Sequence, residues 1–424
     1  MSERAFAAFP RRDGALHAEG VPLARIAEAA GTPTYVYSAG ELRARYRALA
    51  RAFAGARVTI CYALKANMNL AVVRTLVAEG AGADVTSGGE LFRALRAGAD
   101  PRRVVYSGVG KRDDEIDSAL RAGIRMFNVE SRAELQRLDA RAGELGVRAP
   151  VAFRVNPDVD PKTHPYIATG LRTSKFGVPI DEAPGAYAEA KALPNLRVVG
   201  VDCHIGSQLT DVRPFADALA RIRALVLELR SAGHGIEIVD VGGGLGVTYT
   251  DETPPSAGEY AAAVLASVGD LGCEIVLEPG RWIVANAGVL LARVLYEKEN
   301  DGKRFVVVDA AMNDLIRPAL YESVMAIEPV ADAPGDRRTV DVVGPVCESG
   351  DFLAKDRPLP PVGRGDLLAV RSAGAYGFAM SSNYNARPRC AEVLVDGDRF
   401  AVVRARETCE DMVRGESIPA EITG

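Results

Sequence analysis

A lone lysine just past a β-branched and aromatic run is the residue of this chain best placed for covalent chemistry. Lys65 follows the run Val58–Tyr62, inside the segment CYALKAN (61–67). Only eight of the 51 basic residues are lysines, so the chain uses arginine wherever any positive charge suffices. A lysine where a buried strand opens into a loop is a candidate for Schiff-base chemistry with a carbonyl compound. The alternative is a lysine that only covers the end of a strand.

Composition excludes several other classes of protein. The chain has 424 residues, 48% of them hydrophobic and 25% charged, and a net charge of -5. These values are typical of a globular protein of two domains and give no electrostatic footprint for nucleic acid. No apolar run is long enough to span a membrane, and the start MSERAFAAFPRRD is charged where a signal peptide is apolar. We therefore expect a cytoplasmic protein without membrane contact.

Cysteine and histidine usage gives no sign of a metal site. The six cysteines form no C-x-x-C pair, and the four histidines show no ligand spacing. We expect reduced thiols and no bound metal.

The middle of the chain repeats a strand and then a helix, which is typical of a (β/α)8 barrel. The first four β-rich runs are about 21 to 25 residues apart, a spacing within the range of βα units. Eight units in roughly 230 residues match the size of a barrel better than that of a doubly wound sheet. The longer gap between the fifth and sixth runs indicates an insertion. The runs begin near Val58, Ala83, Val104, Met126, Val151, Val198, Ile236 and Glu274.

After about Trp282 the pattern changes to alternating strand-like runs with turn residues between them. These runs predict a second, C-terminal β-rich domain. The first 35 residues match neither pattern, and we expect them to pack onto that domain. The predicted boundaries are therefore 36–282 for the barrel, and 1–35 plus 283–424 for the β-rich domain. The runs are Phe305–Val308, Thr339–Val343, Leu367–Val370 and Ala391–Val395.

Polar residues follow the predicted barrel strands, at the end where barrel enzymes carry their active sites. Each has an ordinary explanation when taken singly: His204 could be a buried core histidine, and Arg154 could form a structural ion pair. Their convergence at one end of a barrel favours an active site. In chain order they are Lys65, Asp84 with Ser87 and Glu90, Ser107, Asn128, Arg154 with Asn156, His204 with Ser207, Gly242–Gly244, and Glu278 with Arg281.

The triple glycine Gly242–Gly244 predicts a phosphate site, because glycine lets backbone N–H groups approach an anion closely. A tight turn is the alternative for these glycines. The dinucleotide fingerprint G-x-G-x-x-G fails at Val247, and no G-K-[ST] ending supports a Walker motif. A phosphate, an imine-forming lysine, a flat imidazole at His204 and an acid at Glu278 together indicate pyridoxal phosphate.

Seven segments resemble the alanine-racemase-fold, pyridoxal-phosphate-dependent decarboxylases (fold type III), over about residues 30 to 410. Within that family the combination of NDLIRPALYE (313–322), HIGSQ and CESGD looks most like the diaminopimelate decarboxylases. The seven segments are YALKAN (62–67), GADVTSGGE (82–90), HIGSQ (204–208), GGGLG (242–246), EPGR (278–281), CESGD (347–351) and the tyrosine of GAYG (374–377).

The resemblance implies roles for the residues that match its motifs. Lys65 is expected to hold the cofactor covalently, His204 to stack on its ring and Glu278 to pair with its pyridine nitrogen. The other expected cofactor-binding residues are Asp84, Gly280 and the phosphate ligands, which are Ser207, Gly243, Arg281 and Tyr376.

The resemblance also implies a substrate site that two subunits of a homodimer share. Arg281, Arg317 and Tyr321 are expected to bind the distal carboxylate of meso-2,6-diaminopimelate, with Tyr376 nearby. Cys347 is the expected proton donor and Glu348 the expected ligand of the distal ammonium, both from the partner subunit. The implied reaction releases carbon dioxide and gives L-lysine, the last step of lysine biosynthesis.

Three other functions remain open on this fold. A decarboxylase of ornithine, arginine or carboxynorspermidine would leave Arg317 with no carboxylate to bind. A non-catalytic carrier of the cofactor usually lacks the β-rich domain and a counterpart of Cys347. A racemase needs a second base on the opposite face of the ring, a role that Tyr376 could fill, although CESGD argues against it.

Overall fold

The computed structural model describes residues 7–159 and 174–423 of the chain. The chain divides into two compact units: residues 41–285, and residues 1–40 together with 286–424. Lys162 and His164, which the sequence counts include, lie outside the described residues. Among the described residues, no helix has the length and apolar character that a membrane span requires.

Residues 41–285 contain a closed barrel of eight parallel strands, as the sequence predicts. Each strand pairs with the next along the chain, and the last pairs with the first, so the barrel has no free edge. The extra strand β10 (Val178–Pro179) pairs with the end of the fifth barrel strand. The barrel strands are β5 (Val58–Ala63), β6 (Gly82–Val85), β7 (Val104–Tyr106), β8 (Met126–Val129), β9 (Ala149–Asn156), β11 (Leu196–Asp202), β12 (Ile238–Asp240) and β13 (Glu274–Leu277).

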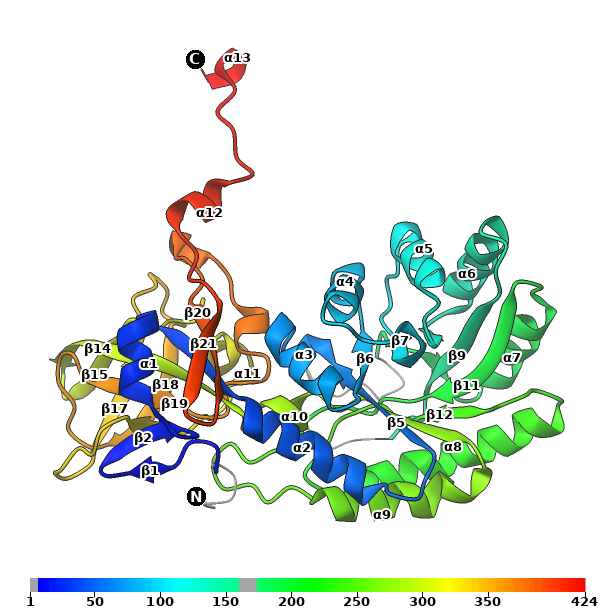
Figure 1. Ribbon diagram of the computed structural model, residues 1–424, viewed down its shortest axis with the longest axis horizontal. Helices are drawn as coiled ribbons and strands as arrows, with labels where there is room; N and C mark the ends of the chain where they lie inside the picture. Colours follow the sequence, from blue (N-terminus) through cyan, green and yellow to red (C-terminus); the bar gives the residue numbers. More distant parts are fainter. Residues whose placement is uncertain (1–6, 160–173, 424) are drawn as a thin grey trace. The chain divides into compact units, whose positions relative to one another are not determined.

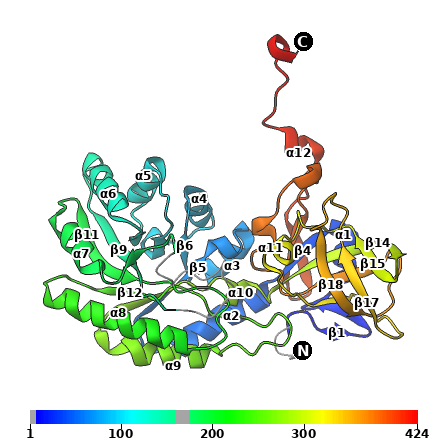
Figure 2. The same cartoon turned by 180° about the vertical axis from the view of Figure 1, so that it is seen from behind.

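Helices surround the barrel strands (Figure 1); one precedes the first strand, and the others follow strands along the chain. The apolar side chains of each helix face the strands; in α8, for example, Phe215, Ile222 and Leu229 are buried at helical spacing. Figure 2 shows α8 and α9 side by side along the barrel. The helices are α2 (Ala39–Ala52), α3 (Leu70–Ala78), α4 (Gly88–Arg96), α5 (Asp113–Ala122), α6 (Arg132–Glu144), α7 (Ala183–Ala192), α8 (Arg213–Ser231), α9 (Ala257–Val268) and the short α10 (Arg281–Val284).

The second unit is built on a mixed sheet, and it contains all four strands that the sequence predicts. The long strand β14 joins the sheet together, because it pairs with β4, β15 and β19. The strands are β4 (Thr34–Ser38), β14 (Gly288–Asn300), β15 (Lys303–Val308), β16 (Ile327–Pro329), β17 (Arg338–Val343), β18 (Phe352–Leu359), β19 (Leu367–Val370), β20 (Ala391–Asp396) and β21 (Arg399–Arg404).

The start of the chain is part of this second unit. Phe9, Leu16 and Ile26 are buried in one hydrophobic cluster with Val289 and Val393. The segment forms a small antiparallel sheet and a helix before β4 enters the main sheet. Its elements are β1 (Arg11–Arg12), β2 (Ala15–Ala18), β3 (Val21–Pro22) and α1 (Leu23–Ala30); the remaining helices of the unit are α11 (Arg317–Tyr321), α12 (Cys409–Val413) and α13 (Ala420–Thr423).

Candidate active site

Lys65 lies on a single turn of 3₁₀ helix, Leu64–Ala66, directly after β5. The pairing of β5 with β6 sets Ala63 beside Asp84, and Lys65 Nζ lies 2.9 Å from Asp84 Oδ2. The Asp84 side chain is fully buried, whereas the Lys65 side chain keeps 35% of its surface exposed. The structure therefore presents an amine that is held by a buried carboxylate and remains accessible.

His204 follows β11, and its ring orientation is fixed by the glycine loop that follows β12. The Gly243 N–H donates to His204 Nδ1 over 3.1 Å, so the proton of the neutral ring lies on Nε2. Burial, followed by the charges of Arg154 and Lys65, holds the pKa of His204 well below its usual range. The ring is therefore uncharged at neutral pH, which suits it to stacking on another flat ring.

Arg281 and Ser207 meet where the loops after β11 and β13 approach each other. Arg281 donates to Ser207 Oγ from Nε over 3.2 Å and from Nη2 over 2.9 Å. Its Nη1 also donates to the Tyr249 hydroxyl over 2.5 Å, and the side chain is buried. A buried guanidinium beside two hydroxyl groups is a suitable environment for an anion such as phosphate.

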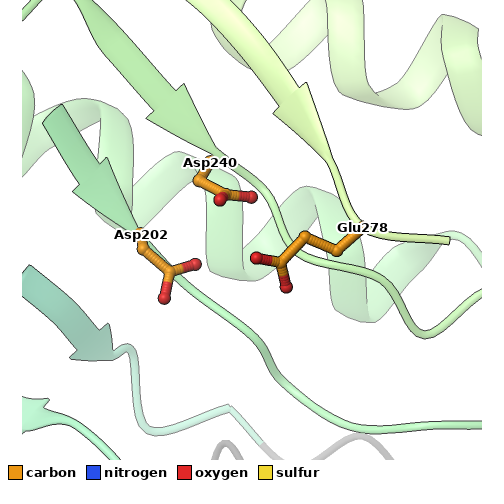
Figure 3. A group of neighbouring side chains, drawn as sticks. All are labelled: Asp202, Asp240 and Glu278. Carbon is orange, nitrogen blue, oxygen red and sulfur yellow. The ribbon is translucent and has the colours of Figure 1, made fainter. Parts of the chain in front are cut away.

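Glu278 lies inside the barrel, directly after β13. Its Oε1 accepts hydrogen bonds from Ser107 Oγ over 3.4 Å and from Asn128 Nδ2 over 3.3 Å. Burial is the main cause that raises the pKa of Glu278 well above its usual range; Asp240 and Asp84 raise it further, and Lys65 opposes them. Figure 3 shows its carboxyl group turned toward those of Asp202 and Asp240.

The glycines at the strand ends let neighbouring parts of the chain approach the backbone closely. A Cβ atom on Gly243 would lie 2.2 Å from the carbonyl oxygen of Glu278, and one on Gly280 would lie 3.0 Å from Ala66 Cβ. Gly244 has a φ of +112°, which favours glycine. The amine of Lys65, the flat ring of His204, the acid of Glu278 and the guanidinium of Arg281 suit a phosphate-bearing pyridine aldehyde.

In the second unit, Arg317 lies between two aromatic rings. Its guanidinium carbon is 5.5 Å from the ring centroid of Tyr321 and 5.8 Å from that of Tyr376. Arg317 is buried at the start of α11, and Tyr376 adopts a φ of +56°. The structure thus brings together three of the residues predicted to bind substrate. A guanidinium held against aromatic rings has a fixed plane, which suits it to binding a planar carboxylate.

Cys347 and Glu348 lie on an exposed turn of the same unit. The turn is fixed through its backbone: the Cys347 N–H donates to Asn385 Oδ1 over 2.8 Å, and Asp351 accepts from the Val346 N–H over 2.7 Å. Both side chains remain exposed to solvent. An exposed turn is accessible to a second molecule, and the roles of Cys347 and Glu348 stay predictions.

Sequence reasoning missed three polar residues of the barrel unit. Tyr249 contacts Arg281, and Asp202 and Asp240 lie beside Glu278. The two aspartates did carry a signal, because each is an acidic residue at the end of a mainly apolar strand. Tyr249 lies beyond the glycine loop, where the local sequence gives no reason to expect a contact with Arg281.

Comparison with known proteins points to one family. Residues 39–285 match the model of the pyridoxal-binding domain of pyridoxal-dependent decarboxylases. The chain is 58% identical to a diaminopimelate decarboxylase of Pseudomonas aeruginosa, over 97% of this chain and 99% of the relative. It is 54% identical to the diaminopimelate decarboxylase of Vibrio cholerae, over 97% of this chain and 99% of that protein.

Solved structures with the same fold agree. The diaminopimelate decarboxylase of M. jannaschii, in complex with L-lysine, superposes with a TM-score of 0.94 at 39% identity and covers 98% of this chain and 99% of its own. A lysine/ornithine decarboxylase of Vibrio vulnificus, in complex with putrescine, reaches a TM-score of 0.77 at 26% identity, with coverage of 88% and 96%. Of these two enzymes, the diaminopimelate decarboxylase is therefore the more similar in both sequence and structure.

Proposed function

The chain belongs to the diaminopimelate decarboxylases, within the pyridoxal-dependent decarboxylases, and we propose that the residues described above carry out its reaction in the following roles. The reaction is the decarboxylation of diaminopimelate to L-lysine with pyridoxal phosphate as cofactor. The single observation that supports the roles best is the convergence of Lys65, Asp84, His204 and Glu278 at one end of the barrel.

In the barrel unit we assign the residues that hold the cofactor. Pyridoxal phosphate supplies a pyridine ring that accepts the electrons left when carbon dioxide departs. Lys65 would hold the cofactor covalently, and Asp84 would orient the Lys65 amine. The neutral imidazole of His204 would pack against the cofactor ring, and the Glu278 carboxylate would keep the ring nitrogen protonated.

Within the barrel unit, the phosphate group is assigned to the loops after β11, β12 and β13. Arg281 supplies the charge, and the hydroxyl of Ser207 lies 2.9 Å from it. Gly243 and Gly280 are assigned as backbone neighbours of the phosphate, since glycine lets N–H groups approach an anion closely.

The second unit carries the residues that we assign to the substrate. Arg317, whose guanidinium carbon lies 5.5 Å and 5.8 Å from the ring centroids of Tyr321 and Tyr376, binds the distal carboxylate of meso-diaminopimelate. In a homodimer, the exposed turn with Cys347 and Glu348 serves the site of the neighbouring subunit. Cys347 then returns a proton to the substrate carbon, and Glu348 binds the distal ammonium.

Peptide mapping tests the central assignment. Borohydride reduction of the cofactor-loaded protein should leave a pyridoxyl phosphate group on the tryptic peptide that contains Lys65. The same label on a peptide with Lys111 or Lys175 instead would refute the assignment of Lys65. Equal labelling of a protein denatured before reduction would show that the label reports only general amine reactivity.

A further inference from the structure

Three barrel strands end in buried acidic groups that the proposed function uses only in part. Asp202 ends β11, Asp240 ends β12 and Glu278 follows β13. One oxygen atom from each carboxyl group lies within 4.8 Å of the others. Figure 3 shows the three carboxyl groups gathered together. Their exposed fractions are 1%, 0% and 5%. The proposed function gives Glu278 a role and leaves both aspartates without one.

Asp240 lies beside Glu278, and the two carboxyl groups share a hydrogen-bonding neighbour. Asn128 Nδ2 donates to Asp240 Oδ2 over 3.2 Å and to Glu278 Oε1 over 3.3 Å. The Gly242 N–H donates to Asp240 Oδ1 over 3.0 Å, which fixes the other oxygen. An ionised carboxylate can only accept, so a hydrogen bond between two carboxyl groups requires a proton on one of them.

The nearest cations are each hydrogen-bonded to a carboxylate outside the group of three. Lys65 Nζ lies 2.9 Å from Asp84 Oδ2, and Arg154 Nη1 lies 3.1 Å from Glu130 Oε1. Lys65 lowers the pKa of Glu278 and Arg154 lowers the pKa of Asp202, but in each case burial, which raises the pKa, has the larger effect. Two adjacent buried carboxylates disfavour double ionisation strongly, as in other enzymes with paired acids.

The other titratable groups around Asp240 are neutral. They are the thiols of Cys61 on β5 and Cys203 after β11, and the phenol of Tyr260 on α9. Burial is the first cause that raises the pKa of each above its usual value. Burial likewise raises the pKa of Asp202 and of Asp240; Asp202 raises that of Asp240 further, and Asp240 raises that of Glu278. Because these two thiols and the phenol keep their protons, they supply no charge that could offset the carboxylates.

We propose that Asp240 and Glu278 share one proton, and that Asp240 carries it whenever Glu278 faces the protonated ring nitrogen of the cofactor. The inference rests on the role given to Glu278 under the proposed function. Asp240 is thus a positioning residue: its O–H donates to the Glu278 carboxylate and holds that carboxylate ionised and in place. When Glu278 loses its positive neighbour, the proton moves along the same hydrogen bond onto Glu278, with no change in the charge of the pair.

Infrared spectroscopy tests the shared proton without reference to activity. At pH 7 the cofactor-loaded protein should lose the carbonyl band of one protonated carboxyl group on Asp240→Asn, because Asp240 carries the proton in that state. The cofactor-free protein should keep such a band, because Glu278 carries the proton there, and should lose the ionised band of Asp240. The matched control Asp114→Asn, at an exposed ion pair with Arg112, should lose only an ionised carboxylate band in both states. Loss of an ionised band on Asp240→Asn in the cofactor-loaded protein, or a bound divalent metal ion at the three carboxyl groups, would overturn the proposal.

Kinetic measurements test whether Asp240 positions Glu278, because one substitution of Asp240 keeps a hydrogen-bond donor and another removes it. In Asp240→Asn the side-chain amide N–H still donates to Glu278, so kcat should stay within about threefold of wild type. Asp240→Ala removes the donor, and kcat should fall roughly 10- to 100-fold with KM little changed. Equal impairment of both variants, or of neither, would refute the positioning role even if the infrared bands behave as expected.

These measurements also separate a variant that fails to fold from a failure of the proposed function. Should Asp240→Ala fail to fold, the infrared result with Asp240→Asn and the kcat of that variant decide the matter. Failure of Lys65 to carry the cofactor, which would remove the proposed function itself, is recognised separately by the peptide mapping.

Discussion

The two units hold their expected site residues in contrasting ways. In the barrel unit the cofactor residues contact one another: Lys65 with Asp84, His204 with Gly243, and Arg281 with Ser207. In the second unit Arg317 is held between two aromatic rings, whereas the turn with Cys347 is exposed and is fixed through its backbone. On the proposed roles, the barrel unit preorganises most of the cofactor-binding residues, whereas substrate recognition depends in part on an exposed turn.

For the barrel unit, the strongest test is to remove the amine of Lys65. Lys65→Ala should abolish the visible absorption of bound cofactor and lower kcat by at least about 10³-fold, because only an amine can hold the cofactor covalently. Absorption spectra and carbon dioxide release measure both effects. Lys355→Ala, at an exposed position, should leave both unchanged. An unaltered spectrum and rate in Lys65→Ala would direct the search to Lys111 and Lys175.

For the second unit, subunit mixing tests whether the exposed turn with Cys347 serves the site of a neighbouring subunit. Inactive Lys65→Ala chains mixed with inactive Cys347→Ala chains should recover part of the activity, because some heterodimers contain one intact site. Activity is measured after subunit exchange has been confirmed with differently tagged chains. Exchange without any recovery would mean that Lys65 and Cys347 of the same chain work together.

Substitution of the stacked arginine should affect the substrate and leave the cofactor in place. A charge-assisted hydrogen bond contributes about 1.5 to 3 kcal/mol, so Arg317→Met should lower kcat/KM for meso-diaminopimelate tenfold or more. Arg317→Lys keeps the charge and loses the planar fork, and its effect should be smaller. The visible absorption of both variants should match wild type. Loss of that absorption would place Arg317 in the cofactor site instead.

A further prediction concerns the stability of the second unit and leaves the reaction aside. Burial raises the pKa of Asp314 to about 6, above its usual value of 3.8. The folded state then keeps a proton that the unfolded state releases, so the free energy of unfolding should fall as pH rises from about 4 to 6. Asp314→Asn should remove up to about 3 kcal/mol of that fall, at 1.36 kcal/mol per pKa unit. Urea unfolding at pH 4, 5, 6 and 7 measures it, and a parallel pH dependence in both proteins would contradict the prediction.

Much of the fold was predictable because the repeat is regular. All eight barrel strands lie where short β-branched runs alternate with helical periodicity, and the four predicted strands of the second unit are confirmed as well. These patterns are local in the sequence, and each strand is buried on both faces or on one.

The site was predictable where a residue type is unusual, and not where a common residue acquires its role from distant neighbours. Lys65 and the triple glycine are recognisable alone, since few positions require them. Asp240 resembles any aspartate at the end of a strand until the closure of the barrel brings Asn128 and Glu278 beside it. Its partners lie 112 and 38 positions away in the sequence, so no local pattern contains the pair.

The most direct test of the account as a whole is the choice of substrate. The purified protein, loaded with pyridoxal phosphate, is incubated separately with meso-diaminopimelate, L-ornithine and L-lysine, and carbon dioxide and amine products are measured. We predict release of carbon dioxide and L-lysine from meso-diaminopimelate and barely detectable turnover of the other two, because both would leave the Arg317 guanidinium without a carboxylate. Comparable turnover of ornithine or lysine would contradict the account and favour a decarboxylase of basic amino acids.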